Sequence, residues 1–187
     1  MIPIKVLVPS GVLGLGFDLE ALNNGVKNNP DIISIDGGST DSGPYSLGSG
    51  TSKYSRAAIK AEWKSLMIAR KKANVPLVIG SCGTCGTNGM VDWMENITIE
   101  LAEELKQNIK IAKLYCQQEK NFIKKKFQLS KIFPLNPAPM LNDQLIEEMT
   151  NIVALAGAEQ IQVCINTGAE IILAGRTTDP AIISALP

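Results

Sequence analysis

Short apolar runs alternate with amphipathic patterns along the whole chain of 187 residues. The runs that read as strands are 4–8, 32–35, 76–79, 109–115, 151–156 and 170–174. The predicted helices are 17–26, 53–73, 91–106, 118–128, 143–149, 159–166 and one that begins at Pro180. Consecutive parallel strands need a crossover, which is usually a helix. The order therefore predicts an α/β fold, a mostly parallel Rossmann-like sheet with helices on both faces.

Two boundaries in this pattern have local signals. Asn142 has the side chain of a helix cap and directly precedes the acidic helix predicted over 143–149. The run 151–156 could form a strand or could equally continue that helix. No linker divides the chain, so we expect one α/β domain over residues 1–187.

Histidine is absent, and the 18 Lys and Arg residues balance the 18 Asp and Glu residues. The first fact removes the commonest general base, the usual Ser and Cys triads and most zinc sites. The second argues against nucleic acid or an acidic membrane surface as a partner. No apolar run approaches the roughly 20 residues of a membrane helix, and the start does not read as a signal peptide. We therefore expect a cytoplasmic protein without a membrane partner.

Small and polar residues cluster directly after five of the predicted strands. These clusters read PSGVLGLG, DGGSTDSGPYSLGSG, GSCGTCGTNG, YCQQE and AGRTTDP. In a parallel sheet such positions share the carboxyl edge, where open α/β folds bind ligands. Of the 17 residues from Asp36 to Ser52, 12 are Gly, Ser or Thr. Turns and helix caps would by themselves account for such residues in a single loop. Five clusters at one edge instead favour a shared ligand site, which the long loop would line.

Nucleotide-binding motifs are missing from these clusters. The pattern G-x-x-x-x-G-K-[ST] does not occur, and Gly14-Leu15-Gly16 lacks the third glycine of the dinucleotide fingerprint. The cofactor, if any, is therefore unknown. Asp36, Asp41 and Asp179 fall at the predicted edge near Arg176. Two such carboxyl groups can form a general acid/base pair or hold Mg²⁺, or they can simply cap helices and loops.

Basic residues follow the long loop at helical spacing. Lys53, Arg56, Lys60 and Lys64 share one side of the helix predicted over 53–73. Lys53 and Arg56 would lie in its first turn, where the helix dipole disfavours a cation. A carboxylate or phosphate ligand would relieve that cost, so we predict an anionic small molecule. For Lys60 and Lys64 a solvated basic face is the alternative.

The cysteines permit a second kind of chemistry. Cys82 and Cys85 form a C-x-x-C after a predicted strand, and Cys116 follows the next strand. This spacing can produce a reactive dithiol or part of a metal site. A fourth ligand is missing, however, and small side chains tolerated in a tight glycine turn are the favoured interpretation, so no metal ligand is assigned.

Two runs, D-G-G-S-T-D-S-G-P-Y and A-G-R-T-T-D-P-A, together resemble the acyclic terpene utilisation family of AtuA-type proteins. The opening glycine turn, I-G-S-C-G and P-L-N-P-A-P extend the likeness along the chain. The resemblance implies a role in bacterial breakdown of citronellol- and geraniol-like terpenes, which proceeds through branched acyl-CoA intermediates. Members of the family are usually longer. The resemblance thus implies an N-terminal portion or one half of a split protein, with a homo-oligomer or a partner chain that carries the remaining segment.

These inferences lead to one predicted site. The catalytic candidates are Asp36, Asp41, Ser81 and Asp179, and the ligand-binding candidates are Gly37, Gly38, Ser39, Thr40, Tyr45, Lys53, Arg56, Gly83 and Arg176. An aspartate would transfer a proton, and the turn 81–83 would stabilise an oxyanion. The expected protein is an enzyme or enzyme subunit of the lyase or isomerase class that binds a branched acyl-CoA or a carboxylate. The alternative is a non-catalytic binding or assembly subunit of a larger complex.

Overall fold

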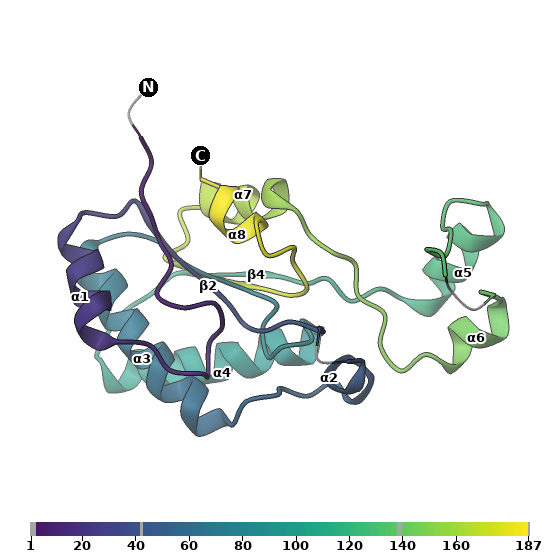
Figure 1. Ribbon diagram of the computed structural model, residues 1–187, viewed down its shortest axis with the longest axis horizontal. Coiled ribbons are helices and arrows are strands. Elements are labelled where there is room, and N and C mark those ends of the chain that lie inside the picture. Colours follow the sequence, from purple (N-terminus) through teal and green to yellow (C-terminus); the bar gives the residue numbers. More distant parts are fainter. Residues whose placement is uncertain (1–2, 42, 138–139, 187) are drawn as a thin grey trace.

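Five parallel strands form a single sheet in a computed structural model that describes residues 3–41, 43–137 and 140–186 (Figure 1). In chain order the strands are β1 (Val6–Leu7), β2 (Ile32–Asp36), β3 (Leu77–Gly80), β4 (Ile111–Leu114) and β5 (Ile171–Ala174). Their order across the sheet is β1-β2-β3-β5-β4, and every neighbouring pair is parallel. The predicted α/β class and parallel sheet are confirmed.

The prediction of a further strand over residues 151–156 is wrong. Within the described residues this segment makes only two isolated bridges, Val153 with Gln117 and Ala156 with Thr177. Its apolar residues pair briefly with the segment that leaves β4, where the Gln118 N–H donates to the Ile152 carbonyl at 2.8 Å. The chain then turns away before a ladder can form, so the apolar run marks a crossing of two connections.

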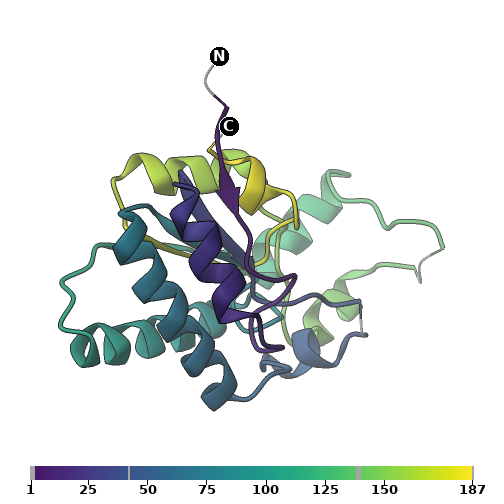
Figure 2. The ribbon, with the colours of Figure 1, turned by 60° about the vertical axis from the view of Figure 1, so that its left-hand side comes forward.

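Two layers of helices cover the sheet (Figures 1 and 2). One face carries α1 (Leu19–Lys27), α3 (Arg56–Ala73) and α4 (Asn88–Glu104), and the other carries α7 (Ala158–Asn166) and α8 (Ala181–Ser184). Alternate strand residues supply the two cores: Ile33 and Ile79 pack with the first layer, and Val78 and Ile172 with the second. The apolar runs are continuous because both faces of the sheet are covered.

Helix boundaries follow the caps. Asn142 caps α6 (Asp143–Glu148), as predicted, by accepting the Leu145 N–H. The helix predicted over 53–73 begins instead at Arg56, because the Ser55 side chain accepts the Ala58 N–H and ends the preceding loop. The long loop also contains a short helix that the sequence analysis missed, α2 (Tyr45–Ser49).

A projecting arm, residues 119–137 and 140–149, extends away from the sheet (Figure 1). It contains α5 (Lys120–Gln128) and α6, which contact each other through a Lys124–Glu147 ion pair. No residue of α5 is buried. Among the described residues, no helix is both long and apolar enough to cross a membrane.

An ion pair between a buried arginine and a half-buried glutamate joins the first helix layer to the amino end of β5. The Arg70 side chain, only 2% exposed, donates from Nη2 to Glu170 Oε1 at 2.5 Å. Glu170 also accepts the Lys110 N–H through Oε2 at 3.0 Å. Among the described residues, Arg70 Nε and Nη1 have no hydrogen-bond partner. The arginine therefore depends on Glu170 for its charge compensation.

We expect Glu170→Ala to lower the free energy of unfolding by about 2–4 kcal/mol, because it leaves a buried guanidinium without a counter-charge. Urea unfolding followed by circular dichroism measures the change. The matched control is Glu103→Ala, which removes an exposed glutamate of α4 and should cost about 0.5 kcal/mol or less. Equal losses for the two variants would contradict the proposed dependence of Arg70 on Glu170.

Candidate functional site

The candidate site lies where the direction of the chain connections reverses. The connection after β3 leads to α4 on one face of the sheet, and that after β5 leads to α8 on the other. Because β3 and β5 are neighbours, their connections diverge and leave a crevice at the carboxyl edge. Ser81 directly follows β3, and Arg176 is the second residue after β5.

The two turns that border this crevice are tied together through the backbone. The Ser81 N–H donates to the Gly175 carbonyl at 2.8 Å, and the Arg176 N–H donates to the Gly86 carbonyl at 3.1 Å. A Cβ at Gly86 would lie 2.3 Å from Arg176 N, and its φ is +66°. Only glycine allows this approach.

Arg176 connects three of the small-residue clusters. Its Nη1 donates to the Gly38 carbonyl at 3.3 Å and to Ser81 Oγ at 3.2 Å, and its Nη2 donates to Thr40 Oγ1 at 3.5 Å. The guanidinium therefore holds the start of the long loop against the β3 turn. Ser81 is fully buried and has a φ of +48°, so its hydroxyl faces this arginine rather than solvent.

A cleft of about 330 Å³ opens beside this arrangement. Its lining residues are Gly11, Val12, Asp36, Ser39, Asp41, Lys53, Tyr54, Thr84 and Asp179. Three of them carry carboxyl groups: Asp36 ends β2, Asp41 lies in the loop after it, and Asp179 comes from the turn after β5. The structure thus brings together Asp36, Asp41 and Asp179, the three aspartates that the sequence placed at one edge.

Asp36 has the most perturbed carboxyl group of the cleft. Burial raises its pKa from the ordinary 3.8 to about 6, and the negative charge of Asp179 adds to the rise. The Gly38 and Gly37 amides and the positive charge of Arg176 favour the ionised form and oppose the shift. A carboxyl group with a pKa near 6 is present in both protonation states close to neutral pH, which suits proton transfer.

The glycines and hydroxyls of the predicted site are mostly used in building it. The Gly37 N–H donates to the Gly80 carbonyl, and the Thr84 N–H donates to the Gly37 carbonyl. In the turn 81–83, which we expected to stabilise an oxyanion, the Ser81 N–H donates to the Gly175 carbonyl and the Cys82 N–H to the Ala174 carbonyl. Gly83 has a φ of +59° and packs against Met90. These amides shape the crevice more than they face a ligand.

The remaining candidates divide between the cleft and the surface. Lys53 lines the cleft, its N–H donates to Thr84 Oγ1, and its ammonium lies 5.9 Å from the centre of the Tyr54 ring. Tyr45, on α2, is 80% exposed. The sequence analysis did not single out Tyr54 or Thr84. Their place in the sequence could have indicated both residues, because Tyr54 follows Lys53 and Thr84 follows Gly83 at the predicted edge.

The basic side of α3 forms ion pairs with α4. Arg56 pairs with Glu100 of α4, Lys60 bridges Glu100 and Glu104, and Lys64 pairs with Glu104. Carboxylates of α4 therefore relieve the dipole cost that we expected a ligand to relieve. These pairs lie on the helix layer, whereas Lys53 lines the cleft and Arg176 lies beside it, near Asp36.

The cysteines are buried. Cys82 and Cys85 have no exposed surface, and burial raises the pKa of the Cys82 thiol far above its ordinary range. Burial also raises the pKa of Cys116. A thiol that stays protonated is a poor nucleophile and metal ligand, so the interpretation of small side chains in a tight turn is favoured. No group of three or more His, Cys, Asp or Glu side chains within the described ranges is placed to hold a metal ion.

Comparison with known proteins identifies one family. Residues 45–186 match the model of the family described as acyclic terpene utilisation family protein AtuA, which is more than half of the chain. The matched region contains Ser81, Arg176 and Asp179 and begins after Asp36 and Asp41. No curated protein and no solved structure matches the chain.

The raised pKa of Asp36 predicts a pH-dependent stability. The folded state retains the Asp36 proton to higher pH than the unfolded chain does, so the free energy of unfolding falls as the pH rises from about 4 to 6. Asp36→Asn removes this effect. We expect the variant to gain about 1–2 kcal/mol relative to the wild type between pH 4 and pH 7, measured by urea unfolding. Asp143→Asn, on the exposed start of α6, is the control, and an equal gain there would contradict the assignment.

Proposed function

We propose that this chain, which belongs to the acyclic terpene utilisation family AtuA, is an enzyme or catalytic subunit that moves a proton on a small acyl substrate. Membership of the family suggests a role in terpene utilisation. The observation that carries the proposal is the Asp36 carboxyl, with its pKa near 6, beside Asp179 and Arg176 in a cleft at the reversal point of the sheet. The reaction class is hydration, dehydration or isomerisation of an enoyl-type acyl group.

In this proposal Asp36 is the group that exchanges the proton. In the isomerisation of a 2-enoyl group, its ionised form removes a proton from the γ carbon to give a dienolate, and its neutral form returns the proton to the γ carbon or to the carbon next to the carbonyl. Asp179 holds the pKa of Asp36 up, and Arg176 fixes Gly38 and therefore the carboxyl's position. The ammonium of Lys53, which also lines the cleft, would face the carbonyl oxygen as negative charge develops.

The charge of the cleft limits the class of substrate that it can bind. Three carboxyl-bearing residues and one lysine line it, so a free carboxylate or dicarboxylate deep in the cleft would meet repulsion. An acyl-CoA carries its negative charge on phosphates, far from an uncharged thioester carbonyl. Of the two anionic ligands that the sequence predicted, the branched acyl-CoA therefore suits the cleft better than a carboxylate does. The cleft, at about 330 Å³, is at the small end for ligand sites and suits the reacting part of such a molecule.

We expect the wild-type protein to exchange deuterium from heavy water into 3-methylbut-2-enoyl-CoA, measured by mass spectrometry. Asp36→Asn should reduce the exchange rate at least ~100-fold, because it removes the proton-transfer group but keeps its shape. Asp143→Asn should leave the rate unchanged. Absence of exchange in the wild type, or an unchanged rate in a folded Asp36→Asn variant, would count against the proposal.

The projecting arm favours a second candidate, an assembly subunit. It exposes Phe122, Leu129, Phe133, Leu135 and Met140, and Leu135 is 87% exposed. On the same arm α5 is basic, with four lysines, and α6 is acidic, with three carboxylates. A surface that carries both positive and negative charge can be self-complementary. A two-fold axis would place α5 of one copy against α6 of the other. The partner that fits best is a second copy of this chain.

We expect the purified protein to run as a dimer in size-exclusion chromatography with light scattering. Phe133→Ser together with Leu135→Ser should shift it toward the monomer, because both substitutions remove apolar contact area. Leu155→Ser, an exposed leucine outside the arm, is the control. A monomeric wild type would remove the support for this candidate without affecting the cleft.

A further inference from the structure

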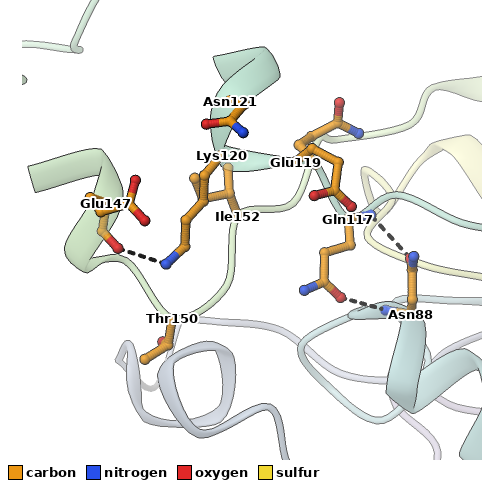
Figure 3. A pocket seen from close by; sticks show the side chains of 9 residues that line it. Asn88, Gln117, Glu119, Lys120, Asn121, Glu147, Thr150 and Ile152 are labelled. Carbon is orange, nitrogen blue, oxygen red and sulfur yellow. Dashed lines mark hydrogen bonds between the residues drawn. The ribbon is translucent and has the colours of Figure 1, made fainter. Parts of the chain in front are cut away.

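A second and larger cleft lies at the base of the arm (Figure 3). It has a volume of about 490 Å³ and sits at the same carboxyl edge of the sheet, between the start of α4, the segment after β4 and the return from α6. Its lining residues are Asn88, Gln117, Gln118, Glu119, Lys120, Asn121, Glu147, Thr150 and Ile152. We propose that this amide cleft binds an uncharged chain of carboxamide and hydroxyl groups, of the kind found in pantetheine.

The first support is the chemistry of the lining. Four of the nine lining residues carry carboxamides, one carries a hydroxyl, and only Ile152 is purely apolar. A carboxamide both donates and accepts hydrogen bonds, so it pairs with another amide or with a hydroxyl in either sense. An apolar ligand would leave these groups unpaired, which is costly in a partly closed cleft.

The second support is that part of the lining is held in place and part is open. The Gln117 carboxamide accepts the Asn88 N–H at 3.1 Å and donates to Asn151 Oδ1 at 3.2 Å. Gln118 donates from Nε2 to the Cys116 carbonyl at 3.0 Å. Within the described part of the chain, no hydrogen bond engages Asn88 Nδ2, Gln118 Oε1 or the Asn121 carboxamide. These groups offer two donor nitrogens and two acceptor oxygens to a ligand.

The third support is the charge, which excludes a phosphate. The cleft has two carboxylates, Glu119 and Glu147, and one ammonium, Lys120. The Lys120 ammonium donates to the Glu147 carbonyl at 2.6 Å, and Glu147 pairs with Lys124. Phosphate sites use arginine forks, clustered lysines or open helix amides. Here the first N–H of α4 is already taken by Gln117, so the amide cleft selects a neutral ligand.

The amide cleft and the Asp36 cleft are close together. Thr84 lines the Asp36 cleft and Asn88 lines the amide cleft, and these two residues stand at the ends of one short turn. Thr150, in the amide cleft, donates to the Gly48 carbonyl of α2, and Asn151 donates to the Leu47 carbonyl. One ligand can therefore extend from a thioester in the Asp36 cleft into the amide cleft. The choice of pantetheine rests on the proposed function, whereas the preference for a neutral ligand does not.

The experiment uses side-chain NH₂ resonances in ¹⁵N-correlated NMR spectra of the full chain, because these report directly on the carboxamides. Pantetheine should shift the NH₂ signals of Asn88, Gln118 and Asn121 in a saturable manner. Adenosine 3′,5′-bisphosphate, the charged remainder of coenzyme A, should not. Gln118→Met and Asn121→Leu should each weaken pantetheine binding about 3–10-fold, the effect of losing one or two hydrogen bonds. Gln162→Met, at an exposed position of α7, is the matched control.

Three results would overturn the inference. They are saturation by the bisphosphate but not by pantetheine, no pantetheine shift in these resonances, and equal affinity in Gln118→Met and the wild type. The outcome is separable from the proposed function. Asp36→Asn should still bind pantetheine in the amide cleft although it loses deuterium exchange. A wild type that binds pantetheine but exchanges no deuterium would refute the proton-transfer proposal alone.

Discussion

The hydrogen bonds of Arg176 are the constraint on which the carboxyl edge depends. A glycine- and serine-rich loop has few side chains with which to bury itself, and the entropy of ordering it is large. Arg176 offsets part of that cost by donating to Gly38, Ser81 and Thr40, which belong to two different loops. Its own position is set by the close contact of Gly86 with the Arg176 backbone. The position of residues 38–40 beside the β3 turn, and with it one side of the cleft next to Asp36, depends on this one side chain.

The environment of Asp36 shows how opposing effects combine in such a site. Full exposure would leave its pKa near the ordinary value, and an unopposed arginine would lower the pKa further. Burial and the negative charge of Asp179 outweigh the glycine amides and Arg176, and the result lies near 6. The same arginine that holds the loop is therefore engaged with backbone and hydroxyl groups, and it does not neutralise the carboxyl completely.

The parts of the structure that the sequence predicted are those that depend on local pattern. Continuous apolar runs indicated strands covered on both faces, and Asn142 indicated the start of α6. The three aspartates met because strand ends of a parallel sheet must share an edge. The role of Arg56 could not be predicted, because its partner Glu100 is separated from it by a whole strand and turn. The run 151–156 and the amide cleft depend on where the arm's two connections cross, and no short-range signal records that crossing.

The segment that follows the arm is hydrogen-bonded to α2 through Thr150 and Asn151, and α2 lies in the loop that begins at Asp36. The same segment is hydrogen-bonded to residues 116–118, so these contacts connect the base of the arm to the loop that carries Asp36 and Asp41. A partner bound to the arm would therefore be connected to the aspartates through hydrogen bonds to the α2 backbone, without contacting them.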